Sequence, residues 1–119
     1  MPTIPPELRE GRSEFDQTLA EALIELSDIR GDLHMHTAAT DGKATLDEMI
    51  AAAKTCGLKY IAITDHSQRV SMANGLDGQR LLEQWAQIDI VNQSEKGHFR
   101  VLKGIECDIL EKGGMDLPD

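Results

Sequence analysis

Two histidines two residues apart mark the part of this chain that can do chemistry. His34 and His36 lie in the stretch 31–42, and in an extended strand residues i and i+2 point to the same face. Asp41 follows in a glycine-terminated turn, so the stretch offers two imidazole nitrogens and a carboxylate oxygen. These are ligands for a divalent metal ion. A chance His-x-His pair on a surface strand explains the two histidines equally well when they are taken alone.

Three segments have the composition of strands, and two helical patterns separate them. We expect strands at 29–35, 60–64 and 99–109, with helices at 45–56 and 77–93. The middle segment is a nearly continuous apolar, β-branched run, which is typical of a buried parallel strand. Strand–helix alternation of this kind predicts an α/β fold with parallel strands and right-handed crossovers.

Local signals set the ends of the two helices. Thr45 and Glu48 have the spacing of a capping box, and Gly57 stands where a helix commonly ends in a left-handed residue. Asp77 is the expected N-cap of the second helix. Trp85 in that helix has no second aromatic residue beside it, so we expect it to belong to the core. Residues 111–116 are expected to form a turn.

Further candidate ligands follow the second and third expected strands. His66 comes directly after the second strand and Glu106 lies near the end of the third. In parallel α/β folds, binding sites form at the carboxyl ends of the strands. A chance pairing of His34 with His36 would not explain why possible metal-binding side chains follow three successive strands. Mixed imidazole and carboxylate ligands suit Zn²⁺, Mn²⁺ or Fe²⁺ better than Ca²⁺. Such ions can activate a water molecule against a phosphoester.

Residues beside the candidate ligands have weaker claims. Asp65 has the opposite strand parity to His66, so we expect it to support the ligands rather than bind an ion. Ser67 and Arg69, and more remotely Arg80, could contact a phosphate, although solvated loop positions explain these residues more simply. The sequence contains no Ser-His-Asp order, Cys-His pair or glycine-rich phosphate loop. We therefore expect no catalytic residue independent of the metal ligands.

Composition limits the classes of function. The chain has 119 residues, 21 of them acidic and 12 basic, with a formal net charge of −9. This balance lacks the clustered positive charge of a nonspecific nucleic-acid binder, whereas grouped carboxylates can hold cations. Two cysteines are too few for a disulfide framework, and no apolar run is long enough to span a membrane. We therefore expect a cytoplasmic protein without a membrane partner.

The candidate ligands sit in phrases that resemble the first three motifs of the PHP (polymerase and histidinol phosphatase) superfamily. These phrases are DLHMHT (32–37), TDG (40–42), ITDHS (63–67) and GIE (104–106). Further phrases are similar to the C-terminal PHP domain of bacterial and archaeal family X DNA polymerases. They are PPELRE (5–10), IRGD (29–32), GLD (75–77) and LKGIECDIL (102–110).

The resemblance implies a distorted (β/α)7 TIM-like barrel with up to three ions of Mn²⁺, Zn²⁺ or Fe²⁺. It assigns one ion to His34 and His36, a bridging role to Glu106, and a further ion to Asp41 and His66. Members of the superfamily act as 3′–5′ exonucleases and DNA end-processing phosphoesterases, or hydrolyse histidinol phosphate. DNA 3′ ends or a small phosphoester are the implied partners.

The chain departs from the superfamily pattern after the third strand. That pattern continues with two more histidines and an Asp-x-His, whereas no histidine follows His98 here. A full barrel needs on the order of 250 residues, so we expect about three βα units of a partial barrel. Residues 1–12 would be a junction, and residues 13–119, with a helix at 13–26, the N-terminal portion of the domain.

Three hypotheses remain open. The chain is a fragment of a phosphoesterase domain from a family X DNA polymerase, or a phosphatase of the histidinol phosphate type, or a non-catalytic remnant. The isolated 119 residues are expected to have negligible activity. A sheet of three strands with open edges is also expected to self-associate.

Overall fold

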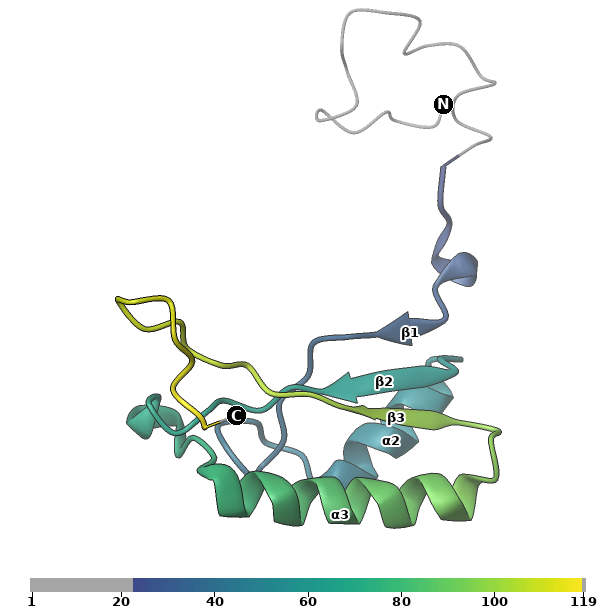
Figure 1. Cartoon of the computed structure of the whole chain (residues 1–119). Helices are drawn as coiled ribbons and strands as arrows, with labels where there is room; N and C mark the ends of the chain where they lie inside the picture. Colours follow the sequence, from purple (N-terminus) through teal and green to yellow (C-terminus); the bar gives the residue numbers. More distant parts are fainter. Residues whose placement is uncertain (1–22, 119) are drawn as a thin grey trace, which may run out of the picture.

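Three parallel strands form one open sheet in the order β1-β2-β3 (Figure 1). The computed structural model describes residues 23–118. In it β1 spans Gly31–Asp32, β2 spans Tyr60–Ile63 and β3 spans Arg100–Lys103. Both crossover helices, α2 and α3, lie on the same face of the sheet (Figure 1). The predicted α/β architecture with parallel strands is therefore confirmed as a partial, open form.

Helix α2, Leu46–Thr55, begins and ends where its sequence predicts. The Thr45 hydroxyl accepts a hydrogen bond from the Glu48 amide at 3.3 Å, and the Glu48 carboxylate accepts one from the Thr45 amide at 2.8 Å. Gly57 follows with φ +79°, a left-handed conformation that a residue with a Cβ rarely adopts. The capping box and the C-terminal glycine are both confirmed.

Helix α3, Gly78–Glu95, runs slightly past its expected end. The Asp77 carboxylate accepts a hydrogen bond from the Arg80 amide at 2.9 Å, which confirms the N-cap. The helix stops where Lys96 and Gly97 take positive φ angles of 49° and 83°. Trp85 is half-buried and packs against the core. The core between helices and sheet consists of Ile50, Ala53, Ile61, Ile63, Ile88, Phe99 and Val101.

The strands are shorter than the apolar runs that predicted them. The first keeps only two paired residues, and the third ends at Lys103 instead of 109. Beyond these ends, hydrogen bonding continues in isolated steps, among them a parallel bridge between His66 and Glu106. Two backbone hydrogen bonds make this bridge, from the Glu106 amide to the Asp65 carbonyl at 2.9 Å and from the Ser67 amide to the Glu106 carbonyl at 3.0 Å.

At the amino end of the described chain the expected helix is not seen, whereas at the carboxyl end the expected turn is present. Residues 13–22 of the expected helix at 13–26 lie outside the described residues, and residues 23–25 are not helical. A short 3-10 turn, Leu26–Asp28, follows, and a second one, Ser71–Ala73, precedes α3. The expected turn at 111–116 is present, closed by an antiparallel bridge between Ile109 and Met115.

The sheet face away from the helices carries exposed apolar side chains. Ile61 and Val101 point into the core, so the alternation of a strand places Tyr60 and Leu102 on the opposite face. Their exposed fractions are 37% and 38%. Within residues 23–118, no helix combines the length and apolar character needed to cross a membrane. The cytoplasmic location stays a prediction.

Candidate metal centre

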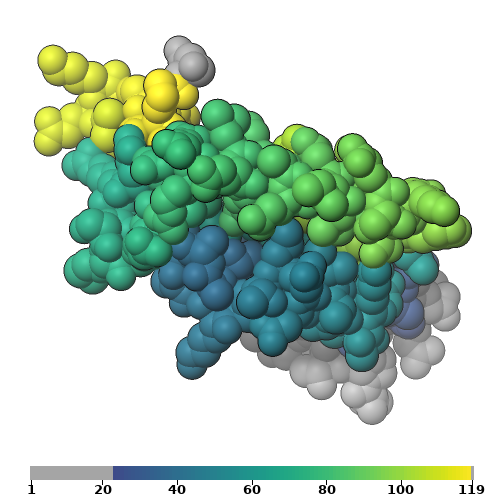
Figure 2. Space-filling view, turned by 90° about the horizontal axis from the view of Figure 1, so that it is seen from below, coloured from purple at the N-terminus to yellow at the C-terminus, as the bar shows by residue number. Residues whose placement is uncertain are grey.

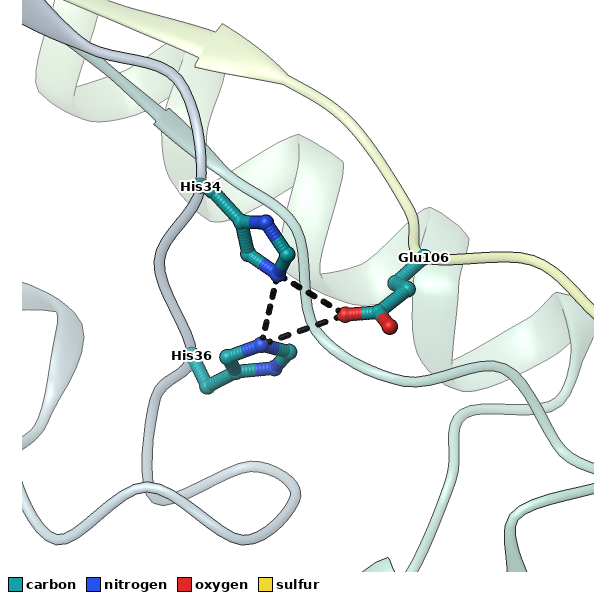
Figure 3. A group of neighbouring side chains, drawn as sticks. All are labelled: His34, His36 and Glu106. Carbon is teal, nitrogen blue, oxygen red and sulfur yellow. Dashed lines mark hydrogen bonds and ion pairs between the residues drawn. The ribbon is translucent and has the colours of Figure 1, made fainter. Parts of the chain in front are cut away.

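His34, His36 and Glu106 bring three ligand atoms together at the carboxyl edge of the sheet (Figure 3). His34 Nε2 lies 3.1 Å from His36 Nε2 and 2.9 Å from Glu106 Oε2, and His36 Nε2 lies 3.2 Å from the same carboxylate oxygen. For metal–ligand bonds of about 2.1 Å, neighbouring ligands around one ion are about 3.0–3.4 Å apart. The triangle therefore has the dimensions of one face of a metal coordination shell.

Hydrogen bonds alone cannot satisfy all three sides of this triangle. A neutral imidazole has one ring proton, so the two Nε2 atoms can supply at most two donors for three close contacts. A cation held between three lone pairs satisfies every side at once. The residues thus fit a divalent ion better than they fit each other.

A second group joins His36 to Asp41 and His66. His66 Nε2 lies 3.3 Å from Asp41 Oδ2, and His36 Nδ1 lies 3.8 Å from Asp41 Oδ1. The His36 and His66 rings stack with centroids 4.4 Å apart. His36 Nδ1 is buried and has no hydrogen-bond partner among the described residues, so it is open to an ion. A neutral imidazole lends one nitrogen to an ion, so His36 serves either group but not both.

Loops rather than strands hold the five predicted ligands. β1 ends at Asp32, so His34 and His36 follow the strand instead of lying within it. His66 and Glu106 come three residues after β2 and β3 end, and the bridge between them sets their separation. Four of the candidate ligands thus lie within four residues of a strand end, Asp41 lies further along the loop after β1, and the structure brings all five together.

The buried carboxylate of Asp65 organises the loop that carries His36 and Asp41. It is fully buried and accepts hydrogen bonds from the Thr37 amide at 2.7 Å and the Thr37 hydroxyl at 2.6 Å. The Thr40 hydroxyl and, at 2.6 Å, the Gln84 side-chain amide also donate to it. This carboxylate is fully engaged by donors, which agrees with a supporting role rather than direct ligation.

Other residues singled out from the sequence make internal contacts. Ser67 is fully buried, and its hydroxyl accepts a hydrogen bond from the Asp108 amide at 3.3 Å. Arg69 has a half-exposed side chain, with Nε 3.8 Å from an Asp108 carboxylate oxygen. Arg80 donates to three backbone carbonyls, including that of Ala39 at 2.7 Å, so its guanidinium ties loops together.

Sequence reasoning missed Thr37, Gln84 and Asp116. Thr37 and Gln84 complete the Asp65 network, and Asp116 binds the segments that follow His66 and Glu106. No spacing rule links Asp65 with a glutamine on a later helix, because that contact exists only after α3 packs on the sheet. For Thr37, its position directly after the His-x-His pair was the one available signal.

This chain is similar in sequence to known proteins. The PHP domain family matches residues 32–116. The chain is 47% identical over 121 aligned residues to a protein of Bacillus subtilis (strain 168) named DNA polymerase/3′-5′ exonuclease PolX, covering 100% of this chain and 21% of that protein. It is 58% identical over 85 residues to the probable phosphatase YcdX of Escherichia coli O1:K1 / APEC, covering 70% of this chain and 31% of that protein.

A third relative is a probable phosphatase of Caldicellulosiruptor saccharolyticus. It is 35% identical over 91 residues, which covers 74% of this chain and 35% of that protein. The chain thus spans between about a fifth and about a third of the length of these curated relatives.

Proposed function

We propose, from the premise that this chain belongs to the PHP domain family, that it is part of a metal-dependent phosphoesterase domain acting on DNA ends in repair. The proposed reaction is hydrolysis of a phosphodiester or phosphomonoester, including 3′–5′ exonuclease action, with DNA 3′ ends as partner. The similarity to the Bacillus polymerase supports this choice because it extends over the whole chain, including residues 1–31 before the family match begins.

The triangle of His34, His36 and Glu106 carries the proposal. These three residues would hold one divalent ion of Mn²⁺, Zn²⁺ or Fe²⁺, with Asp41 and His66 holding part of the shell of another. Glu106 Oε2 also lies 3.9 Å from His66 Nδ1, so its carboxylate borders both groups and can bridge them. A complete domain would hold up to three ions.

Bound in this centre, divalent ions lower the pKa of a water molecule and neutralise the charge on phosphate oxygens. The protein's own residues orient and expose the centre. Asp65 fixes the loop on which His36 and Asp41 lie, and the side chains of His34 and Glu106 are 66% and 43% exposed. A phosphate on the terminus of a polymer can reach ligands that face solvent in this way.

Metal binding by the chain itself is the first test. Zn²⁺ and Mn²⁺ binding is measured by titration against a competing chelator for the unaltered chain, His36→Ala and His98→Ala. We expect His36→Ala to lose at least tenfold in affinity, while His98→Ala, which removes an exposed histidine just before the amino end of β3, does not change it. Equal affinities for all three proteins would refute the assignment.

Hydrolysis is the second test. A 3′-labelled oligonucleotide is incubated with this chain, and with any longer natural protein that contains it, before and after chelation. We expect metal-dependent cleavage by a protein that contains the whole domain and its loss in His36→Ala. Equal rates with and without chelator would contradict the proposed function.

A small-molecule phosphatase is the second candidate. The Escherichia coli relative, whose name is probable phosphatase, is 58% identical over 85 residues, which cover 70% of this chain. The acidic balance of the chain also suits a small substrate better than a long polyanion. Comparing kcat/KM for histidinol phosphate with that for a DNA 3′ end separates the two candidates.

For the isolated 119 residues we expect partial metal occupancy and negligible hydrolysis, as for a non-catalytic remnant. The described residues supply one three-atom ligand set and share His36 with the second. Elemental analysis that finds three tightly bound ions per chain would contradict this expectation.

A further inference from the structure

We infer that Asp116 is a positioning residue for the metal centre, because its carboxylate ties together the two segments that directly follow His66 and Glu106. The inference rests on the proposed metal centre and deepens it. Asp116 belongs to the turn after residue 110, far in sequence from the first ligands.

The Asp116 carboxylate accepts hydrogen bonds from both segments. The Arg69 amide donates to Oδ2 at 2.9 Å. On the other side, the Cys107 thiol and the Asp108 amide donate to Oδ1 at 2.9 Å and 3.2 Å. One carboxylate thus spans the chain three residues after His66 and the chain one and two residues after Glu106.

The backbone of Asp116 adds two more ties to the same segments. Its amide donates to the Asp108 carbonyl at 3.2 Å, and the Gln68 side-chain amide donates to its carbonyl oxygen. The residue therefore contacts residues 68, 69, 107 and 108 at once. These contacts close a ring around the His66–Glu106 bridge.

The contacts of Asp116 are needed to hold the two segments together because the sheet ends before it reaches His66 and Glu106. β2 stops at Ile63 and β3 at Lys103, so the two ligands lie beyond the continuous ladder. Among the described residues, two backbone hydrogen bonds make the His66–Glu106 bridge, and they join Glu106 to Asp65 and Ser67 on either side of His66. The Asp116 carboxylate then holds the next residues on each side, which limits how far His66 and Glu106 can separate.

The ionised form of Asp116 suits this role. Burial by itself raises the pKa of this carboxyl, but hydrogen bonds from the Cys107 thiol, the Arg69 amide and the Ser67 hydroxyl together lower its pKa below the usual 3.8. All of its contacts are with donors. In Asp116→Asn one oxygen becomes an NH₂ group, which must face a donor and lose at least one of these contacts.

The first experiment measures how the centre responds to loss of this carboxylate. Co²⁺ and Zn²⁺ affinities and the Co²⁺ absorption spectrum are recorded for the unaltered chain and Asp116→Asn. We expect a tenfold to hundredfold loss of affinity and an altered spectrum, the usual size of effect when a ligand's supporting group is removed. Unchanged affinity and spectrum would overturn the inference.

Two controls separate positioning from general destabilisation. Asp77→Ala removes the N-cap of α3 and should lower the thermal midpoint without changing the Co²⁺ spectrum. Cys107→Ala removes one donor to Asp116 and should show a smaller loss of affinity, which Cys107→Ser, with a hydroxyl in place of the thiol, should restore. If Asp77→Ala alters the spectrum as strongly as Asp116→Asn does, the positioning role is refuted.

A metal-free experiment distinguishes failure of this inference from failure of the proposed metal centre. Amide hydrogen exchange is measured without metal in the unaltered chain and Asp116→Asn. We expect faster exchange at the Ser67, Arg69 and Asp108 amides, and unchanged exchange within β2. Unchanged exchange at all three amides would refute the role of Asp116. If the unaltered chain binds no metal, the proposed centre fails and the positioning role fails with it, while the exchange result still shows whether Asp116 holds the two segments together.

Discussion

At the scale of single residues, the loop between His36 and Asp41 is fixed from both sides. The Asp65 carboxylate accepts hydrogen bonds from the hydroxyls of Thr37 and Thr40, and Gly42 lies against the backbone of the same loop. The Gly42 amide donates to the Thr37 carbonyl at 3.0 Å, which turns the chain back on itself. The spacing of His36 and Asp41 is therefore set by residues outside the proposed ligand set.

Replacing Gly42 tests how rigid this loop must be. A Cβ at Gly42 would lie 2.6 Å from the His36 carbonyl oxygen and 2.7 Å from the Thr37 carbonyl carbon, which are backbone atoms that cannot move independently. We expect Gly42→Ala to lower the free energy of unfolding by about 1–3 kcal/mol, as overpacking does. It should also weaken metal binding, because His36 must shift. Urea denaturation and metal titration measure both effects.

Gly78 provides the matched control for this substitution. A Cβ there meets no atom within 4 Å, and the residue opens α3 without a positive φ. Gly78→Ala should be neutral or stabilise the fold by about 0.4–1 kcal/mol, since it restricts the unfolded chain. If both variants lose equal stability, steric contact at Gly42 is not the cause.

At the scale of elements, the two crossover helices were easier to predict than the strands. The ends of α2 depend on Thr45, Glu48 and Gly57, which act on neighbours within a turn and are readable from the sequence. A strand's end depends on where its partner stops pairing. The apolar runs therefore located β2 and β3 but overestimated the length of β3, and placed His34 within, and His36 at the end of, a strand that ends before both.

The difference between local signals and long-range contacts also explains which residues of the candidate metal centre could be predicted. Four of the five candidate ligands were readable because they follow strand segments, and Asp41 was readable from its place in the turn after the His-x-His pair. The groups that support them were not readable, since the contacts of Asp65 with Gln84 and of Asp116 with Arg69 join residues 19 and 47 apart. Such contacts form only when the elements have packed, and they have no periodic pattern along the chain.

The capping box of α2 makes a prediction about pH. Hydrogen bonds from the Thr45 amide and then the Thr45 hydroxyl lower the pKa of Glu48 below its usual 4.5. A carboxylate with a lowered pKa stabilises the folded state above its unfolded pKa, and this contribution disappears as the pH falls through the folded pKa. We expect Glu48→Gln to be less stable than the unaltered chain at pH 7 and the difference to shrink below pH 4.5.

Thr45→Ala serves as the background for this test. It should cost about 1 kcal/mol through loss of the N-cap side chain. In that background the pH dependence of the Glu48→Gln effect should decrease, because the hydroxyl that bonds to the carboxylate is absent. Thermal unfolding between pH 3 and pH 7 measures all four proteins. A pH dependence of equal size in both backgrounds would show that the Thr45 hydroxyl does not contribute and that the backbone amide of residue 45 alone lowers the pKa of Glu48.

At the scale of the whole molecule, the sheet has unpaired edge strands and one face that no helix among the described residues covers. β1 and β3 each pair with β2 alone, so both have an open edge among the described residues. The helices cover one face of the sheet (Figure 1), while Leu102 and Tyr60 lie exposed on the other. Figure 2 shows the helical side, where α2 and α3 form a continuous surface.

This asymmetry leads to the prediction that the isolated chain self-associates through the open side of its sheet. Unpaired strand edges and exposed apolar faces favour association between chains. We expect the sedimentation coefficient to rise with protein concentration, and Leu102→Lys to reduce this dependence by placing a charge on the open face. Leu82→Lys is the matched control, because Leu82 is 64% exposed and lies on α3.

The two variants distinguish association through the open face of the sheet from association through other exposed apolar side chains. If the helical face mediated association, Leu82→Lys would reduce it as much as Leu102→Lys, and the sheet would not be the contact surface. A single, concentration-independent species for the unaltered chain would contradict self-association altogether. Because the proposed metal ligands lie at the carboxyl edge of the same sheet, metal titrations of this chain must be compared at one protein concentration.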